Sequence, residues 1–296
     1  MKTIPAKTIV TKVKKPAEWF GIDYNMNIYR GCPHGCIYCD SRSDCYRDPN
    51  FSTVKVKENA LQVIRDDLGR KVKKGVVATG AMSDPYNPLE RSLKLTRNSL
   101  ELINAFHFGV AIATKSTLVT RDIDILKDIK SHSPVIVKIT ITTCDDDLSQ
   151  KIEPHVATSS ERFAMLKELS DAGIYCGVLM MPILPFINDT EENIQGILQQ
   201  AKEAGAKFVY PSFGMTLRQG NREYYYEKLD ELFPQLKQKY RSMYENRYMC
   251  TSRKAKKLWE LFVNLCNQHE LIYSMRSITQ SYKRGYQMQQ LSFFDE

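Results

Sequence analysis

The chain has 296 residues, carries a net charge of +8 and is 43% hydrophobic, which suffices for one large α/β domain with an appendage or for two small domains. It holds no apolar run of about 18 residues, and the basic residues 1–15 lack the apolar stretch of a signal peptide, so we expect a cytoplasmic protein with no membrane span. Eight cysteines, three of them close together, are too few and too unevenly spaced for a disulfide scaffold.

Short apolar runs alternate with helical patterns up to about residue 215. The predicted strands are Tyr24–Tyr29, Val76–Thr79, Gly109–Ala113, Val135–Ile141, Ile174–Met181 and Phe208–Phe213. The predicted helices between them are Glu58–Leu68, Arg97–Phe106, Arg121–Ile129, Ser160–Ala172 and Glu191–Ala204. Strands separated by helices indicate a parallel sheet of βαβ units. Six units are fewer than the eight of a closed barrel, so a partial (β/α)6 barrel and a doubly wound sheet both fit.

After residue 216 the alternation stops and only helical patterns follow, most clearly over Glu223–Phe233, Pro234–Tyr244 and Arg253–Glu270. We therefore expect four parts. These are a basic N-terminal segment (1–22), an α/β core (23–215), a helical basic C-terminal region (216–280) and a polar tail (281–296).

Three cysteines, Cys32, Cys36 and Cys39, follow the first predicted strand with the spacing C-x3-C-x2-C. Thiolates at this spacing fit one tight loop and suit an iron–sulfur cluster. Three ligands leave one iron of a four-iron cluster open, where a small molecule with an amine and a carboxylate can chelate. The alternative is structural zinc with His34 or Cys45 as a fourth ligand, although the usual second pair of zinc ligands is missing from the sequence.

The cysteine spacing, with Tyr38 before the last cysteine, resembles the hallmark of the radical S-adenosylmethionine (SAM) superfamily. The resemblance implies an enzyme, a lyase or a transferase, with a [4Fe–4S] cluster held by the three cysteines and SAM bound at the open iron. Reductive cleavage of SAM would then yield a 5′-deoxyadenosyl radical, which requires a flavodoxin- or ferredoxin-type reductant. The superfamily also implies a partial (β/α)6 barrel with the C-terminal helices as an extension.

Further motifs at successive strand ends resemble the spore photoproduct lyase-like branch, also called DNA repair photolyase-like. They are Ser83-Asp84-Pro85-Tyr86, Thr114-Lys115-Ser116, Ile139-Thr140-Ile141-Thr142-Thr143, Glu153-Pro154 and Pro182-Ile183. Each motif is weak alone, but their order along residues 20–215 makes the resemblance specific.

Five residues are candidates for binding SAM. Ser83 and Asp84 follow the second predicted strand and Lys115 ends the third, where ligands of α/β sheets bind. Lys115 could pair with the SAM carboxylate. The resemblance adds Tyr38 and Thr140. The alternatives are a solvated surface lysine at 115 and an ordinary turn at residues 83–84.

The chain departs from spore photoproduct lyase itself at Ala81, where that enzyme carries a cysteine that donates a hydrogen atom. Alanine cannot do so, and we do not expect lysis of spore photoproduct. Cys144 and Cys176 are candidate donors if either faces the site, although buried cysteines usually act as small hydrophobes. Glu153 and Arg162 either orient the nucleoside or form a structural ion pair.

Residues 237–257 carry eight lysines and arginines against one acidic residue, with Tyr240, Tyr244 and Tyr248 between them. Cations for phosphates and aromatic rings for bases indicate a DNA- or RNA-binding surface. Tyr240 and Tyr244 are four residues apart, so they could equally be a core stripe.

The last residues, Gln290, Leu291, Ser292, Phe293 and Phe294, resemble the short peptide that docks bacterial proteins on the sliding clamp. The alternative is a tail that packs on its own domain.

The sequence thus predicts a radical SAM enzyme that acts on a nucleic acid, in DNA lesion repair or modification. One alternative is a radical SAM enzyme that modifies a protein, a peptide or a small metabolite. Another is a non-catalytic, cluster-bearing nucleic-acid-binding module, against which the set of strand-end motifs argues.

Overall fold

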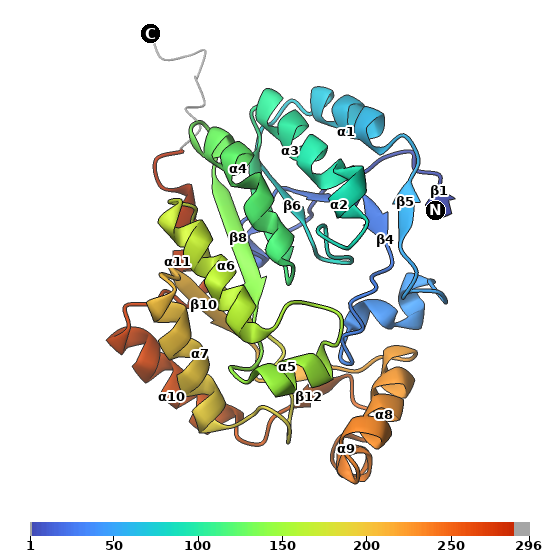
Figure 1. Ribbon diagram of the computed structural model, residues 1–296, viewed down its shortest axis with the longest axis vertical. Helices are drawn as coiled ribbons and strands as arrows, with labels where there is room; N and C mark the ends of the chain where they lie inside the picture. The colour runs from blue at the N-terminus through green and yellow to red at the C-terminus, as the bar shows by residue number, and fades with distance from the viewer. Residues whose placement is uncertain (1, 287–296) are drawn as a thin grey trace.

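A computed structural model describes residues 2–286 (Figure 1). Its centre is a seven-stranded sheet with the strand order β10-β9-β8-β7-β6-β3-β2. The strands are β2 (Val10–Lys12), β3 (Tyr24–Met26), β6 (Val76–Thr79), β7 (Gly109–Thr114), β8 (Val135–Thr140), β9 (Cys176–Met180) and β10 (Phe208–Pro211). Each of the six strands from β3 to β10 is parallel to its neighbours in that series, and only β2 is antiparallel.

The six parallel strands follow one another across the sheet in chain order. A doubly wound sheet would reverse direction at a switch point, so the fold is the partial (β/α)6 barrel. Five helices connect these strands and form an outer layer (Figure 1). They are α1 (Ala60–Gly69), α3 (Leu95–Ala105), α4 (Ile123–Lys130), α6 (Ser159–Asp171) and α7 (Glu191–Glu203).

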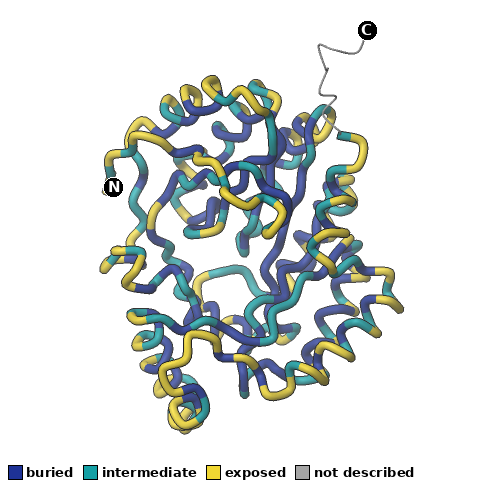
Figure 2. The backbone as a smooth tube through the Cα atoms, turned by 180° about the vertical axis from the view of Figure 1, so that it is seen from behind, coloured by how far each residue is buried: buried dark blue, intermediate teal, exposed yellow. Residues whose placement is uncertain are grey.

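Alternate residues of each strand face either these helices or the barrel interior, because side chains point to opposite faces of a strand. The outward residues, such as Val77, Ile112 and Val178, belong to the main hydrophobic core beneath the helices. The inward residues at the amino ends of the strands belong to a separate cluster. Figure 2 shows the buried strands inside helices that expose one face.

Helix α11 (Met275–Lys283) closes the base of the barrel. Its residues Ile278 and Tyr282 pack in the interior cluster with Phe20 and Phe208. The hydroxyl of Tyr282 donates to the carbonyl oxygen of Phe20 at 2.7 Å. Helix α10 (Ala255–Gln268) packs outside, against α7. Helices α10 and α11 therefore complete the barrel.

The remaining elements lie around the mouth of the barrel. They are β1 (Lys2–Ile4), β4 (Tyr29–Arg30), β5 (Lys55–Lys57), α2 (Glu90–Leu93), α5 (Asp146–Ile152), β11 (Gly214–Thr216), α8 (Asn221–Leu232), α9 (Leu236–Tyr244) and β12 (Met249–Thr251). Two expectations were wrong: Tyr24–Tyr29 is two strands, and the region after residue 216 includes β12, which pairs with β11.

The part boundaries at residues 22, 215 and 280 stay predictions, and β11 and α11 cross two of them. Among residues 2–286, no helix combines the length and the apolar character needed to cross a bilayer.

Candidate functional site

A cavity of about 120 Å³ lies at the carboxyl ends of β6, β7 and β8, facing the loop after β4. All three predicted cluster ligands and all five predicted SAM-binding residues line it, together with a few neighbours. The lining residues are Cys32, His34, Cys36, Tyr38, Cys39, Ser41, Gly80, Ala81, Met82, Ser83, Asp84, Ala113, Thr114, Lys115 and Thr140. Segments from four places in the chain (residues 32–41, 80–84, 113–115 and 140) thus meet at one point of the fold.

The thiols lie on a loop that a close backbone contact holds in place. The amide of Cys32 donates to the carbonyl oxygen of Phe51 at 2.7 Å. Gly31 before it has a φ of +83°, and a Cβ there would lie 2.4 Å from the carbonyl oxygen of Thr53. Only glycine fits such a position. Burial raises the pKa of Cys32 to about 11 and raises that of Cys36 as well, so thiolates here need a bound cation.

The donor set fits a cluster with three protein ligands. A cluster spreads its thiolates over separate iron atoms, so the thiols must face one cavity and need not converge on one point. Within residues 2–286, no three His, Cys, Asp or Glu side chains gather closely enough to hold a single metal ion. Cys45, the alternative fourth zinc ligand, is exposed outside the cavity, with its Sγ 3.4 Å from Nη1 of Arg218.

Asp84 joins the ends of two strands. Its Oδ1 accepts from the hydroxyl of Thr114 at 2.7 Å and from the amide of Tyr86 at 2.9 Å. Its Oδ2 accepts from the amide of Lys115 at 2.8 Å and lies 3.7 Å from Nδ1 of His34. Residues 83–86 therefore do form the turn that was the alternative to a binding role. Through the bond from the Lys115 amide to Asp84, this turn also positions Lys115.

Lys115 and Ser83 present polar groups to the cavity that have no partner within the described part of the chain. Lys115 is half-buried, its Nζ lies 5.6 Å from the ring centroid of Tyr38, and no carboxylate of the described chain forms an ion pair with it. Burial favours a lower pKa of Lys115, but the nearby Cys36 and Glu153 outweigh burial and raise it. Ser83 is buried, and its hydroxyl has no hydrogen-bond partner among residues 2–286.

Glu153 and Arg162 form a fully buried ion pair behind the cavity. Glu153 also accepts from the hydroxyl of Tyr38, and Nη1 of Arg162 donates to the carbonyl oxygen of Thr140 at 2.7 Å. Neither side chain lines the cavity. The pair is thus structural and connects the cysteine loop with the end of β8.

The two other candidate cysteines lie outside the cavity. Cys176 is fully buried in the core beneath the helices, with its Sγ 3.6 Å from the carbonyl oxygen of Leu166. Cys144 packs close to Gly196 of α7. Ala81 lines the cavity whereas Cys144 and Cys176 do not, so this geometry offers no support for either cysteine as the donor.

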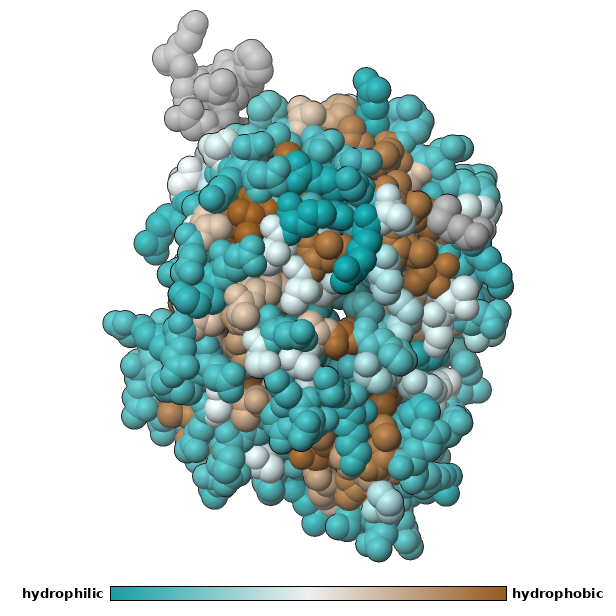
Figure 3. Space-filling model, viewed as in Figure 1, coloured by the Kyte–Doolittle hydropathy of each residue, from teal (hydrophilic) through white to brown (hydrophobic). Residues whose placement is uncertain are grey.

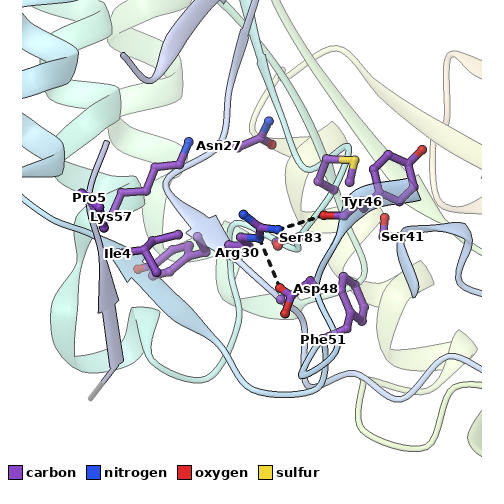
Figure 4. A pocket seen from close by; sticks show the side chains of 13 residues that line it. Ile4, Pro5, Asn27, Arg30, Ser41, Tyr46, Asp48, Phe51, Lys57 and Ser83 are labelled. Carbon is purple, nitrogen blue, oxygen red and sulfur yellow. Dashed lines mark hydrogen bonds and ion pairs between the residues drawn. The ribbon is translucent and has the colours of Figure 1, made fainter. Parts of the chain in front are cut away.

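A second cavity of about 290 Å³ adjoins the first and shares Ser41, Met82 and Ser83 with it (Figure 4). Arg30 and Lys57 reach toward it from β4 and β5. Sequence reasoning missed this cavity, because β1 and β5 are too short to show a strand pattern.

The basic region divides into buried and exposed tyrosines. Tyr240 and Tyr244 are buried in a core cluster with Tyr225, so the core-stripe alternative is correct for both. Tyr248 is 47% exposed, and its hydroxyl accepts from Nη2 of Arg218 at 2.8 Å. Trp259 is 45% exposed. The tail motif, Gln290 to Phe294, lies outside the described residues.

Comparison with known proteins places this geometry in context. The family model described as the Radical SAM superfamily matches residues 26–201. An uncharacterized protein of Mycobacterium tuberculosis is 32% identical over 245 residues, which cover 80% of this chain and 72% of that protein. An uncharacterized protein of Methanocaldococcus jannaschii is 36% identical over 191 residues, covering 64% and 69% of the two chains.

Solved structures share the fold at low identity. A spore photoproduct lyase variant gives a TM-score of 0.65 at 15% identity, covering 89% of this chain and 78% of its own. Spore photoproduct lyase complexed with dinucleoside spore photoproduct gives 0.62 at 14%, covering 84% and 74%. The radical SAM methyltransferase TsrM from Kitasatospora setae, with its tryptophan substrate, gives 0.57 at 12%, covering 84% and 54%. These likenesses confirm the fold.

Proposed function

This chain belongs to the radical SAM superfamily, as an enzyme with a [4Fe–4S] cluster and SAM as cofactors, and from that premise we propose that it acts on a nucleic acid. When bound, the two cofactors supply a 5′-deoxyadenosyl radical that abstracts a hydrogen atom from the substrate. The observation that carries the radical SAM chemistry is one cavity in which three thiols meet a lysine without an ion pair and a hydroxyl without a hydrogen bond, both within residues 2–286.

In this proposal each group has one task. Cys32, Cys36 and Cys39 hold three irons of the cluster. The ammonium of Lys115 pairs with the SAM carboxylate, because it lines the cavity and no carboxylate among residues 2–286 forms an ion pair with it. The hydroxyl of Ser83 binds the amino group. The remaining candidates, Tyr38, Asp84 and Thr140, line the same cavity and shape it.

Two observations support a nucleic acid as the substrate. The fold resembles an enzyme solved with a dinucleoside. A basic surface also adjoins the cysteine loop, where Nε of Arg218 lies 3.5 Å from Oδ1 of Asp40 and its guanidinium lies 4.9 Å from the ring centroid of Tyr248. The exposed cations beyond it are Lys239, Arg241, Arg247, Arg253, Lys254, Lys256 and Lys257. Ala81 argues against lysis of spore photoproduct itself.

Two protein partners complete the proposal. A flavodoxin- or ferredoxin-type protein supplies the electron. The tail motif Gln290-Leu291-Ser292-Phe293-Phe294 docks on a sliding clamp, which would bring the enzyme to DNA. A clamp pull-down that is unchanged by deletion of residues 290–296 would exclude the docking role.

The test is anaerobic. The protein is reconstituted with iron and sulfide, reduced and mixed with SAM, and 5′-deoxyadenosine is measured with DNA, RNA, a peptide mixture or no addition. We expect formation that DNA or RNA stimulates, and none with Cys36→Ala. Absence of 5′-deoxyadenosine, where a known radical SAM enzyme forms it, would reject catalysis by the cluster. Stimulation by peptides alone would reject the nucleic-acid substrate.

A further inference from the structure

The barrel interior is open near the cofactor cavity. The inward residues toward the carboxyl ends of four strands, Asn25, Ala113, Met181 and Tyr210, are partly exposed, whereas their outward neighbours are buried beneath helices. The molecular surface is hollowed near its centre in Figure 3. A substrate that reaches the cofactor cavity from inside the barrel would therefore contact the inward row of side chains.

One residue of that row carries an amine. Lys138 lies in the middle of β8, where its sequence neighbours Val137 and Ile139 point outward into the main core. Its register partners are Ala113 on β7 and Gly177 on β9, two small residues that leave room for a long side chain. Ala113 also lines the cofactor cavity, so Lys138 lies next to it on the interior side.

This amine has no partner of its own. Lys138 is 2% exposed, and within residues 2–286 it forms neither an ion pair nor a side-chain hydrogen bond. Its Nζ lies 4.7 Å from the ring centroid of Phe20, a contact that offsets only part of the lost hydration. Burial alone lowers the pKa of Lys138 to about 7. Buried lysines are rare unless they are paired, and an apolar residue would fill the same space without this cost.

The surrounding groups suit a flat, polar ligand. Phe20 also contacts Tyr210, with ring centroids 5.4 Å apart, and so brings Tyr210 close to Lys138. Tyr210 meets the ring of Trp19 at 5.9 Å. Asn25 lies farther round the sheet, on β3 with β6 and β7 between it and β8, and its side-chain amide forms no hydrogen bond within residues 2–286. An amine, an amide and aromatic rings are the groups with which proteins hold a base that has left its stack.

We propose that Lys138 is a substrate-binding residue whose amine donates a hydrogen bond to a carbonyl oxygen of a nucleobase held in the barrel interior. The inference rests on the proposed function and names the group of the substrate that this site recognises. The base supplies the hydrogen-bond acceptor that Lys138 lacks within residues 2–286. This hydrogen bond also positions the base so that the hydrogen to be abstracted lies beside the cofactor cavity.

The first experiment uses the unaltered chain. The reconstituted protein with SAM is labelled with trace acetic anhydride at pH 8, with and without mixed-sequence single-stranded DNA, and each lysine is quantified by mass spectrometry. We expect acetylation of Lys138 in the native protein and several-fold protection by DNA. Lys127, exposed on α4, serves as the unprotected control. Labelling of Lys138 that occurs only after denaturation, or that DNA leaves unchanged, would overturn the proposal.

The second experiment compares Lys138→Met, of similar length, with Lys127→Met. We expect Lys138→Met to lose DNA-stimulated formation of 5′-deoxyadenosine by about tenfold, the loss expected when one hydrogen bond to the substrate is removed. Its SAM affinity, measured by calorimetry, should match that of the unaltered protein. Equal stimulation in Lys138→Met and the unaltered chain would reject the role of Lys138 alone. Failure of both DNA and RNA to stimulate even the unaltered chain would reject the proposed substrate class.

Discussion

At the scale of single residues, Asp84 supports the candidate site by positioning the residues beside it. Its carboxylate accepts from the amide of Lys115 and the hydroxyl of Thr114, so both strand ends are held before any cofactor binds. A direct role of Asp84 in binding SAM stays a prediction. The contacts explain why a carboxylate, with its four accepting positions, is needed here.

Asp84→Asn should therefore weaken both stability and SAM binding. The new amide nitrogen would face the N–H of Lys115 in place of an acceptor, which costs about 1–3 kcal/mol of unfolding free energy when buried. Urea unfolding and calorimetric titration of SAM measure the two effects. Asp128→Asn, on the exposed side of α4, should change neither. An unchanged unfolding midpoint in Asp84→Asn would show that the strand ends do not depend on this carboxylate.

The buried amine of Lys138 should make stability depend on pH. The pKa of Lys138 is about 7 in the folded chain against the usual 10.5, so the unfolded chain binds more protons between these values. The folded state therefore gains stability as pH rises from about 7 to 10.5, by up to a few kcal/mol. Below pH 7 the buried amine is protonated, and its full destabilising effect on the folded state is present. Lys138→Met should remove this slope and be the more stable protein at pH 7, as chemical denaturation across the pH range would show.

At the scale of elements, the carboxyl ends of β6 and β7 approach each other closely. The residue that follows β6, Gly80, must therefore lack a side chain. Gly80 has a φ of +94°, and a Cβ on it would lie 1.9 Å from the carbonyl oxygen of Ala113. Backbone atoms cannot give way as a flexible side chain can. The same glycine lines the cofactor cavity.

Gly80→Ala should thus lower the unfolding free energy by several kcal/mol and disturb cofactor binding together with it. Gly69→Ala is the matched control, because it lies in α1 with only ordinary contacts to Phe106, and should be neutral or slightly stabilising. Thermal unfolding and the iron content after reconstitution measure both outcomes. Equal behaviour of the two variants would contradict the close approach of the strands.

The elements also show which parts of the fold were predictable. All five strands from β6 to β10 and their connecting helices were predicted within a few residues, since buried parallel strands are continuous apolar runs. The three-residue strands β1, β5 and β12 carry no such pattern. Strand pairing and the packing of Tyr240 and Tyr244 depend on contacts that are distant in sequence.

Much of the candidate site was also predictable, because its residues lie in short motifs at strand ends that the fold brings together. Lys138 was missed, although a single lysine within the apolar run Val135–Thr140 was its signal. Whether Lys138 faces the barrel interior or the outer helices can be decided only from the packing of the sheet. The structural role of Glu153 and Arg162 was one of two open alternatives, and only their burial decided between them.

At the scale of the whole molecule, charge is distributed unevenly around the mouth of the barrel. The cations between residues 239 and 257 are exposed, and the Arg218–Tyr248 contact links them with the cysteine loop. Several of them already have partners, such as Lys257 with Glu191. Arg253 and Lys256 form no ion pair within the described chain, so substituting them is the better test of whether this surface binds DNA.

The double variant Arg253→Glu and Lys256→Glu should bind single-stranded DNA about tenfold more weakly or worse, and its affinity should fall less steeply with salt, because fewer counterions are released. Fluorescence anisotropy from 50 to 200 mM salt measures both. Arg65→Glu with Lys127→Glu, on α1 and α4, makes the same charge change elsewhere and should have little effect. Equal losses in the two double variants would indicate a response to net charge alone.

Helix α11 has a consequence for how the protein is made. The three thiols are synthesised by residue 39, whereas the helix that closes the base of the barrel begins at Met275 and meets Phe20 across almost the whole chain. On the ribosome, the nascent chain therefore carries these cysteines while the barrel is still open at its base. Closure of the base of the barrel therefore follows the synthesis of Met275–Lys283, long after the three thiols have been made.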